Sequence, residues 1–575
     1  MEAGQRKVVA VVGFYLPGIY PAGDDAVVSD LLAPALIKAT ADADPDVAAR
    51  YDVRLFNFPT TIDLAEATLR ICEANPVLVA YSVYVWNYSQ TMTCSSLVRR
   101  FLPEAPIVMG GPQVMYCAIE EMQKHPQIDV IVYGNGELRF RQMLKEGLSP
   151  ELFARMPRLT YRDAGKRIVQ TEGEVVDDIS EIPSPYQTGA IDLDDGLRHT
   201  VFIETFRGCP FKCGYCVWGD NDVRIRRFDL DQILRDVEIV YNNPNVEVVY
   251  MTDACLLYTR DRARRICDKI ASCSRKIPTV MTLDIRMLDE ETIECLSKVE
   301  LIRNQYHFGL QSTNPEALAL LNRRIPEDVF IARIGLLRRL KPEAEISLDL
   351  IYGLPGDNYE GFRKSVDFAY SLNPSRLYLS HLLLLPGTPF WDRREELGLD
   401  HSDEPPYMVR SNRQFTTADM KAAMTWVMWI QMMNYFEAIK DAILRIREHR
   451  AELRYIHLID RMIEIVKERL DPVSELAHGF TLESENANRR HVMNTFAKPE
   501  NGLVMYEAAM QLLKECGVEQ SLGENLEVGI RYYRSLCQNC GEADMTLLAA
   551  HGKKEIRYIQ TQWRVSGGRS GVSAH

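Results

Sequence analysis

The sequence of 575 residues lacks the features that would indicate several common classes of protein. It has no apolar run of the roughly 18 residues that a membrane-spanning helix needs. Basic residues are in the minority, and the net charge of −13 argues against a nucleic-acid backbone as the main partner, because phosphate binding needs a basic surface. The composition, 46% hydrophobic and 26% charged, is that of an ordinary globular protein and excludes disordered and fibrous classes.

Cysteine is sparse and unevenly placed. The chain has 13 cysteines, an odd number, and most of them stand singly within apolar segments. This usage suits a reducing compartment better than a disulfide framework, so we expect a cytoplasmic protein. The short apolar run near the N-terminus is followed by Gly, Pro and acidic residues instead of a small-residue cleavage site, which indicates a first β-strand and not a signal peptide.

Residues 1–145 alternate apolar runs with helical patterns. The runs that read as strands buried on both faces are Val8–Tyr15, Val53–Pro59, Val77–Trp86, Ala105–Gly111 and Asp129–Gly134. Strands with almost no polar alternation, each followed by a helix, predict a doubly wound, Rossmann-like parallel sheet. Ligands of such sheets bind at the carboxyl ends of the strands. The loops there carry no G-x-G-x-x-G motif, so nothing supports a dinucleotide site.

The remainder of the chain divides into three parts. Residues 146–195 read as a linker with one hairpin, and from residue 196 to 400 the β–α alternation resumes. Six candidate strands follow there, within TVFIETFRG, VEVVYMTD, TVMTLDIR, RNQYHFGLQ, EISLDLIYGLPG and SRLYLSHLLLLPGTP. Six β/α units predict a partial (β/α)6 barrel with its site at the C-terminal strand ends. Residues 401–575 predict a helical domain, so the expected fold class is α/β with a helical C-terminal third.

Three cysteines, Cys209, Cys213 and Cys216, stand close together in RGCPFKCGYC, directly after the first barrel strand. Structural zinc takes four ligands, whereas the C-x2-C pair at Cys537 and Cys540 would make five and lies far along the chain. A [4Fe–4S] cluster has four irons, so three thiolates would leave one iron open for a substrate or cofactor. The position of the motif at a barrel strand end favours the cluster.

This motif resembles that of the radical S-adenosylmethionine (SAM) enzymes. The resemblance extends to DIR (Asp284–Arg286), FGLQSTNPEALALLNR (Phe308–Arg323), DLIYGLPGD (Asp349–Asp357) and LLLLPGTPF (Leu382–Phe390). It implies that Cys209, Cys213 and Cys216 hold a [4Fe–4S] cluster whose open iron chelates SAM. It also implies SAM contacts from Asp284, Arg286, Gln311, Ser312 and Arg323.

The N-terminal domain is similar to the cobalamin-binding domain found in one large branch of that family. The matching segments are YSVYVWN, IVMGGPQ, IVYGNGE and the linker EIPSPY. The cobalamin contacts that the resemblance implies come from Tyr84, Trp86, Gly110, Gly111, Pro112, Gly134, Gly136 and Glu137. Tight βα turns would explain the glycines equally well. The D-x-H-x-x-G motif that supplies a cobalt-ligating His is absent, which makes Tyr84 or Trp86 the candidate for the lower corrin face.

The resemblance implies a cobalamin-dependent radical SAM methyltransferase that moves a methyl group from SAM, via methylcobalamin, to a carbon of a small-molecule or natural-product substrate. A non-radical member of the family methylates C2 of tryptophan for a thiopeptide antibiotic. Two alternatives stay open: a cyclase or oxidoreductase of the Mg-protoporphyrin ester cyclase type, and a cofactor-binding regulator without turnover. Tyr306 and His307 are candidates for a base that faces the substrate, although core packing would also place them on a strand.

The implied partners follow from this chemistry. They are a small-molecule substrate and, if the chemistry is radical, an electron donor such as flavodoxin or ferredoxin. We expect no nucleic-acid or membrane partner, and a monomer.

Overall fold

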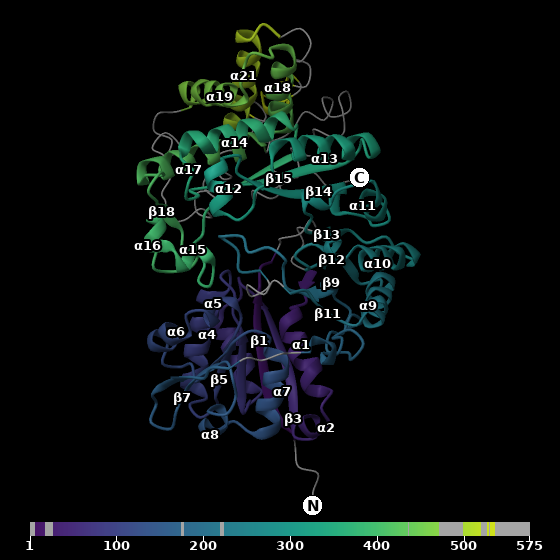
Figure 1. Cartoon of the computed structure of the whole chain (residues 1–575), viewed down its shortest axis with the longest axis vertical. Helices are drawn as coiled ribbons and strands as arrows, with labels where there is room; N and C mark the ends of the chain where they lie inside the picture. The colour runs from purple at the N-terminus through teal and green to yellow at the C-terminus, as the bar shows by residue number, and fades with distance from the viewer. Residues whose placement is uncertain are drawn as a thin grey trace, which may run out of the picture.

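Three units follow one another along the long axis of the molecule (Figure 1). The computed structural model describes residues 6–17, 27–173, 178–218, 224–434, 436–470, 498–518, 526–527, 529–534 and 537. A seven-stranded sheet with helices on both faces forms one end, the cysteine-bearing β/α unit lies in the middle, and helices α18, α19 and α21 form the other end (Figure 1). Within the described part of the chain, no helix is both long and apolar enough to cross a membrane.

The first unit is the predicted doubly wound sheet, with strand order β3-β1-β4-β5-β6-β7-β8. Its strands are β1 Lys7–Tyr15, β3 Tyr51–Pro59, β4 Leu78–Ser82, β5 Ile107–Gly110, β6 Val130–Val132, β7 Leu159–Arg162 and β8 Ile168–Gln170. The first five are parallel, as predicted, and the antiparallel hairpin β7–β8 lengthens the sheet from within the predicted linker. The predicted strand Val77–Trp86 ends earlier, at Ser82, so Tyr84 and Trp86 lie in the loop beyond it.

Helices cover both faces of this sheet because successive strand residues point to opposite sides. Val9 and Val11 of β1 pack with α1 Leu32–Asp42 and α7 Gly136–Glu146, whereas Ala10 and Val12 pack with α3 Leu64–Glu73 and α4 Tyr88–Phe101. The shorter helices of the unit are α2 Pro45–Ala48, α5 Pro112–Met115, α6 Ala118–Lys124 and α8 Pro150–Phe153. Both faces of the sheet are therefore closed, and its strand ends remain for ligands.

The middle unit contains all six predicted strands. They are β9 Arg198–Ile203, β12 Val246–Met251, β13 Thr279–Met281, β14 Gln305–Gln311, β15 Glu345–Tyr352 and β16 Arg376–His381. Single parallel bridges, Thr279 to Leu301 and Leu283 to Phe308, join the sheet β13-β12-β9 to the sheet β14-β15-β16 and give one curved wall. The helices that cover its outside are α9 Leu230–Asn242, α10 Arg260–Ser272, α11 Glu290–Leu296, α12 Pro315–Leu320, α13 Glu327–Leu340 and α14 Tyr359–Ser371. The wall is the predicted partial barrel.

A strand that the sequence pattern did not indicate joins the two α/β units. β2 Val27–Ser29 precedes α1 of the first unit but pairs in parallel with β9 of the barrel. Next to this pair, the buried His199 ring contacts Asp30 through Nδ1 at 2.9 Å and Asp195 through Nε2 at 3.0 Å. The barrel sheet is thus completed by a segment from the N-terminal part of the chain.

The linker segment EIPSPY is fixed to the barrel by a buried carboxylate. The Ser184 hydroxyl donates to Asp236 Oδ1 at 2.5 Å, and the Gln187 amide donates to the same oxygen at 2.6 Å. Asp236 lies on α9 and is only 3% exposed. Burial raises the pKa of Asp236 to about 6, against the lowering effect of the bonds from Gln187 and Ser184.

Replacing Asp236 with asparagine is expected to raise the melting temperature at neutral pH. A carboxyl whose pKa is raised by folding stabilises the protein below its unfolded pKa, and that stability is lost as pH rises through about 6. Asparagine keeps the accepting oxygen and removes the buried charge, a gain of up to roughly 3 kcal/mol at neutral pH. Thermal unfolding of both proteins from about pH 4 to 8 measures this, and the difference should vanish at the acidic end. Parallel stability curves would contradict the assignment.

The C-terminal part packs on the outside of the barrel. After the small helices α15 Pro389–Asp392 and α16 Arg394–Leu397, the antiparallel pair β17 Asp400–His401 and β18 Val409–Ser411 leads into the helices. These are α17 Thr417–Asn434, α18 Glu437–His449, α19 Tyr455–Arg469 and α21 Pro499–Glu515. The Met- and Trp-rich segment forms α17, which is buried on most sides as predicted, and Trp426 Nε1 donates to Asp460 of α19 at 2.9 Å. Cys537 is exposed, and Cys540, the other cysteine of the C-x2-C pair, lies outside the described residues.

Candidate active site

The three cysteines lie on a loop that leaves the barrel after β9. The antiparallel pair β10 Phe206–Arg207 and β11 Arg226–Arg227 closes the base of this loop. Cys213 is buried and Cys209 and Cys216 are half-buried. The Cys216 amide donates to the Cys213 carbonyl at 3.1 Å, and the Trp218 amide donates to Cys216 Sγ at 3.3 Å. The loop therefore wraps its sulfur atoms inward instead of exposing them.

Segments from two later strand ends hold the cysteine loop. The Gly214 amide donates to the Leu321 carbonyl at 3.1 Å, and the Phe390 amide donates to the Gly214 carbonyl at 2.9 Å. A Cβ at Gly214 would lie 2.4 Å from the Phe390 ring, so only glycine allows this approach. The two motifs that end at Arg323 and Phe390 thus hold the loop in place through these backbone hydrogen bonds.

The cysteine thiols are held in a desolvated setting. Burial, together with the neighbouring Cys213 and Cys209, raises the pKa of Cys216 to about 11, against the lowering effect of the bond from the Trp218 amide. Burial also raises the pKa of Cys209, while Arg323 lowers it. Thiolates are the form that binds iron, so cations must replace the protons at this site. Among the described residues no group of three His, Cys, Asp or Glu fits a single metal ion. A cluster, in which the thiolates bind separate irons, suits this donor set.

The end of β13 contacts the cysteine loop through an arginine. Asp284 is 2% exposed and binds Arg286 through both oxygens, at 2.9 and 2.5 Å, while the Tyr258 hydroxyl donates to it at 3.0 Å. Burial opposes its ionisation, but Arg286 and Arg323 hold the pKa of Asp284 below its usual value. The Arg286 guanidinium lies 3.8 Å from the centre of the Phe211 ring, within the cysteine loop. The structure therefore brings Asp284 and Arg286 to the cysteines.

Gln311 and Arg323 lie together at the end of β14. Gln311 has a φ of +67°, which is uncommon outside glycine, and a Cβ at Gly309 would collide with its amide nitrogen at 2.2 Å. Arg323 donates to the Gly309 carbonyl at 3.1 Å and approaches Asp284 to 3.9 Å. Within the described part of the chain, Gln311 Oε1 and Arg323 Nε are buried and make no hydrogen bond. Both side chains lie beside Gly309, so among the described residues the end of β14 carries one unpaired acceptor and one unpaired donor, in a backbone conformation that carries strain.

Ser312, the next predicted SAM contact, is placed differently. Its hydroxyl donates to Asp357 at 3.0 Å and accepts from the Asn314 amide at 3.0 Å, and the residue is 1% exposed. These bonds tie the start of α12 to the loop after β15. The side chain serves the packing of the strand ends, and a direct contact between Ser312 and SAM stays a prediction.

Tyr306 and His307 face opposite sides of β14, as neighbouring strand residues must. Tyr306 is 2% exposed and packs in the main core under the outer helices. His307 faces the inside of the barrel, where its Nε2 contacts Asp349 Oδ2 at 2.7 Å and its ring stacks on Tyr378 with centres 5.2 Å apart. Of the two, His307 is the one that reaches the barrel interior.

The glycines predicted to meet cobalamin lie at the carboxyl edge of the first sheet. Gly111 has a φ of +114°, and a Cβ there would lie 2.4 Å from the Val83 carbonyl oxygen, so this turn requires glycine before Pro112. Gly134 also has a positive φ, of 65°. A Cβ at Gly136 would meet no atom within 4 Å, and one at Gly110 only the Val132 carbonyl at 4.0 Å. The edge therefore offers an open backbone surface of the kind that a flat macrocycle requires.

Tyr84 and Trp86 stand beside this edge. Their rings are stacked, 4.3 Å apart at 12°, and Trp86 is 46% exposed. The electrostatic neighbours of Tyr84 are Glu204, Arg207 and Glu137, so the aromatic pair lies near the start of the cysteine loop.

Glu137 links the two units and is not exposed at the sheet edge. It is the second residue of α7 and accepts hydrogen bonds from both terminal nitrogens of Arg207, at 2.7 and 3.2 Å. Burial disfavours its charge, but Arg207 holds the pKa of Glu137 below its usual value. A direct contact between Glu137 and cobalamin stays a prediction.

Several residues of the site were not predicted to act there. Arg207 and Asp349 begin two of the quoted motifs and Glu204 stands just before the first of them, but charged side chains at strand ends are ordinarily expected to face solvent. Asp253 accepts from the Thr205 and Phe206 amides at 2.8 and 3.0 Å and so fixes the entry to the cysteine loop. The sequence could have indicated these residues only through their position, because each stands within a few residues of a strand end that carries a motif.

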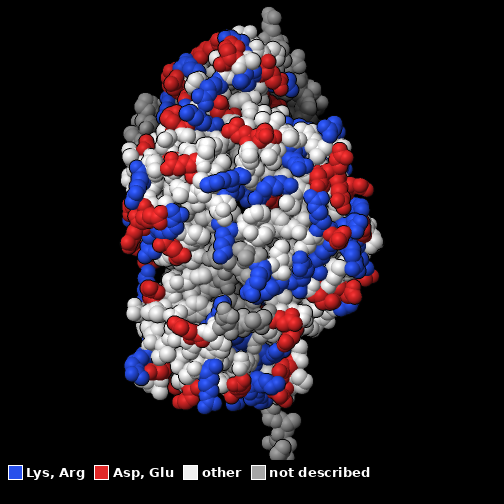
Figure 2. Space-filling view, in the orientation of Figure 1, with Lys and Arg blue, Asp and Glu red and all other residues white. Residues whose placement is uncertain are grey.

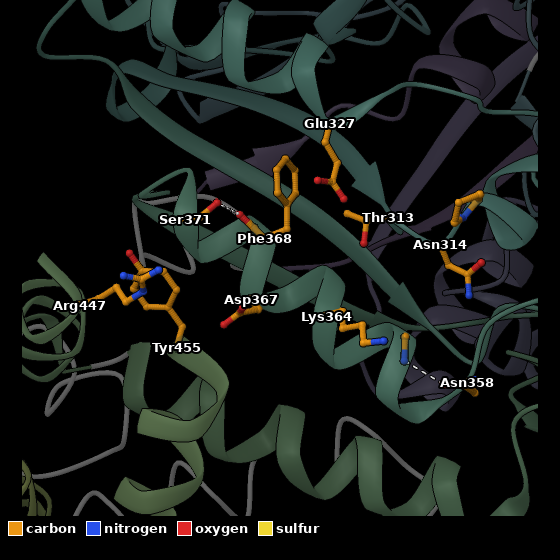
Figure 3. A pocket seen from close by; sticks show the side chains of 12 residues that line it. Thr313, Asn314, Glu327, Asn358, Lys364, Asp367, Phe368, Ser371, Arg447 and Tyr455 are labelled. Carbon is orange, nitrogen blue, oxygen red and sulfur yellow. Dashed lines mark hydrogen bonds between the residues drawn. The ribbon is translucent and has the colours of Figure 1, made fainter. Parts of the chain in front are cut away.

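The cavity shown in Figure 3, of about 600 Å³, lies elsewhere, between the barrel helices α12 and α14 and the helices α18 and α19. Lys364 and Arg447 lie well apart along it and do not converge on a common point (Figure 3). None of its lining residues belongs to the predicted cofactor sites.

Comparison with known proteins agrees with the site. The model of the Radical SAM superfamily matches residues 203–369. The cobalamin-dependent radical SAM methyltransferase TokK of Streptomyces tokunonensis is 25% identical over 71% of this chain and 62% of its own length. The 2-(S-pantetheinyl)-carbapenam-3-carboxylate methyltransferase of Streptantibioticus cattleyicolor is 28% identical over 60% of this chain and 52% of its own. The chain thus spans less than two thirds of either relative.

Solved structures show the same fold. The radical SAM methyltransferase TsrM of Kitasatospora setae superposes with a TM-score of 0.53 at 17% identity, over 69% of this chain and 77% of its own. The cobalamin-dependent SAM radical enzyme OxsB gives a TM-score of 0.58 at 14% identity, over 99% of this chain and 85% of its own. The order of a Rossmann-like unit, a radical SAM barrel and C-terminal helices is shared with these proteins.

Proposed function

We propose that this chain, which carries a radical SAM domain behind a Rossmann-like unit, is a methyltransferase that uses SAM and cobalamin to methylate a carbon of a small molecule. One observation carries the proposal. Arg207 joins the cysteine loop of the barrel by hydrogen bonds to residues 134–137 of the first sheet, here called the glycine loop. The two expected cofactor sites therefore share one boundary. The similarity to TokK and to the carbapenam methyltransferase supports the same activity.

The residues present fit the cluster and SAM. Cys209, Cys213 and Cys216 would hold a [4Fe–4S] cluster, which supplies the electron for SAM cleavage if the chemistry is radical. SAM carries an amino group that donates and a carboxylate that accepts. Gln311 Oε1 and Arg323 Nε are a buried acceptor and a buried donor without partners among the described residues, and they would satisfy both groups.

The first sheet fits cobalamin, which would carry the methyl group between SAM and the substrate. Gly110 and Gly136 leave the edge of the sheet open, and Gly111 keeps the backbone close to β4. The sequence has no D-x-H-x-x-G motif, so the stacked Tyr84 and Trp86 would cover the lower corrin face without a protein imidazole on cobalt.

The barrel interior would receive the substrate beside His307. This imidazole is held by Asp349 and supported by the Tyr378 ring, so its position is fixed while 38% of its side chain stays exposed. A fixed imidazole–carboxylate pair can orient a polar group of the substrate or accept a proton from it. Tryptophan and a pantetheinyl carbapenam are the candidate substrates, and a flavodoxin or ferredoxin would be the electron donor.

The methyl group of SAM is expected to pass to cobalamin and then to the product. We would incubate anaerobically reconstituted protein with hydroxocobalamin, a reductant and SAM labelled with ¹³C in its methyl group, with and without each candidate substrate. Mass spectrometry should find the label on the extracted corrin without substrate and on the product with it. Release of 5′-deoxyadenosine with an unlabelled corrin and an unlabelled product would favour the cyclase or oxidoreductase alternative and contradict the proposal.

A further inference from the structure

We propose that Arg207 is a positioning residue that couples the cluster site to the cobalamin site, so that filling either site tightens the other. The inference rests on the proposed function, because it concerns the same two cofactors. It adds a regulatory property: the protein binds cobalamin strongly only when its cysteine loop holds a cluster.

Arg207 is bonded to both units at once. Its terminal nitrogens donate to Asn135 Oδ1 at 2.8 Å and to both oxygens of Glu137, while its Nε donates to Glu204 at 2.8 Å. The Arg207 side chain is 13% exposed and that of Glu137 is 6% exposed. Planar, two-point binding of a carboxylate by arginine fixes orientation as well as distance. The loop of residues 134–137 therefore has its place defined by Arg207.

The side chain of Asn135 binds Arg207 and not the helix that it precedes. It occupies the N-cap position of α7 with an extended backbone, yet its side chain makes no capping bond to that helix. Its oxygen accepts from Arg207 instead. The charge-assisted bond to Arg207 offsets the loss of that helix cap. The glycine loop is thus built to depend on a residue of the other unit.

The charges explain why each filled site should strengthen, and not weaken, binding at the other. Glu137 and Glu204 are two acids in a poorly solvated place, and Arg207 donates hydrogen bonds to both, with one positive charge against their two negative charges. A buried carboxylate without its partner is strongly destabilised. If Arg207 moved, Glu137 would have to turn toward water, and the glycine loop that begins α7 would move with it.

The position of Arg207 depends in turn on the cluster. Arg207 stands two positions before Cys209, and within the described residues the loop beyond it is held by the hydrogen bonds of Gly214 and by the contact of the Phe211 ring with Arg286. A cluster adds bonds to three side chains of that loop and removes its freedom. Cobalamin then binds to a glycine loop that is already ordered, so its binding costs less conformational entropy. By linkage, bound cobalamin must strengthen cluster binding by the same factor.

The test measures hydroxocobalamin affinity by absorbance for the full chain, once with the reconstituted cluster and once free of iron. We expect the dissociation constant of the wild type to be about tenfold lower with the cluster. Glu137→Gln should bring this ratio close to one, because the amide removes the charge that Arg207 binds. A direct contact between Glu137 and cobalamin would change both constants by the same factor and leave the ratio intact.

Two further variants complete the test. Arg207→Lys keeps the charge but loses the two-point geometry, so its ratio should fall between those of the wild type and Glu137→Gln. Asp460→Asn breaks a similar pair with Arg363, between α14 and α19, and should keep the wild-type ratio. A wild-type ratio near one, or a ratio unchanged in Glu137→Gln, would overturn the inference. Absence of any hydroxocobalamin binding would instead contradict the proposed function.

Discussion

Cys213→Ala protein, reconstituted anaerobically with iron and sulfide, is expected to hold almost no cluster. The wild type should bind about four irons per chain and absorb broadly near about 400 nm, and the variant should lose both. Cys213 is the buried cysteine of the three, and the backbone bond from the Cys216 amide to its carbonyl does not depend on the side chain that the substitution removes. Removal of one of only three thiolates leaves the cluster too few protein ligands.

Cys273→Ala is the matched control for this experiment. Cys273 is 8% exposed, close to the 9% of Cys213, but it follows α10 and its thiol donates to the Lys269 carbonyl at 3.3 Å. This variant should keep the full iron content, which separates loss of a ligand from loss of a buried thiol. Four irons retained in Cys213→Ala would mean that the cluster, if present, has other ligands.

Arg323→Gln is expected to weaken SAM binding by about ten- to a hundredfold, since a bond to a charged group contributes roughly 1.5–3 kcal/mol. Arg323 is a buried cation that lowers the pKa of Cys209, and its Nε has no hydrogen-bond partner among the described residues. Its removal leaves Asp284 still bound to Arg286, so the barrel should stay folded. Calorimetric titration of the reconstituted protein with SAM, without reductant, measures the affinity.

Arg338→Gln serves as the control for Arg323. Arg338 also donates to backbone carbonyls, those of Leu372 and Asn373, but it lies on the outer helix α13. The control should bind SAM like the wild type, and both variants should keep their iron. Equal SAM affinity in Arg323→Gln and the wild type would remove Arg323 from the SAM site.

The strands of both α/β units could be predicted because parallel strands buried on both faces leave an apolar run in the sequence. β2 could not, because its short apolar run ends at Val28, before Ser29 and Asp30, and its partner lies in the other unit. The sequence could not tell whether Tyr306 or His307 faces the barrel interior, because that depends on how β14 pairs with β15. Ser312 and Glu137 show a different limit: a motif places a residue near the site, but its contacts decide whether it can face a ligand.

The surface follows the composition only in part. On the face seen in Figure 2, acidic and basic side chains alternate around the rim, so the net charge of −13 is not gathered into one patch there. The net charge is known from the sequence, but the distribution of charge on that face depends on where each side chain lies.

The pairing of β2 with β9 has a consequence for synthesis of the protein on the ribosome. β2 is made early, but the contact of Asp30 with His199 spans 169 positions, so the segment must wait for the first barrel strand. Closing so long a loop is slow and depends on contacts between distant parts of the chain. The first sheet can assemble beforehand, since its parallel strands lie within the first 132 residues. Cutting the gene between the two α/β units would therefore yield a barrel with an uncovered edge strand, which is prone to aggregate.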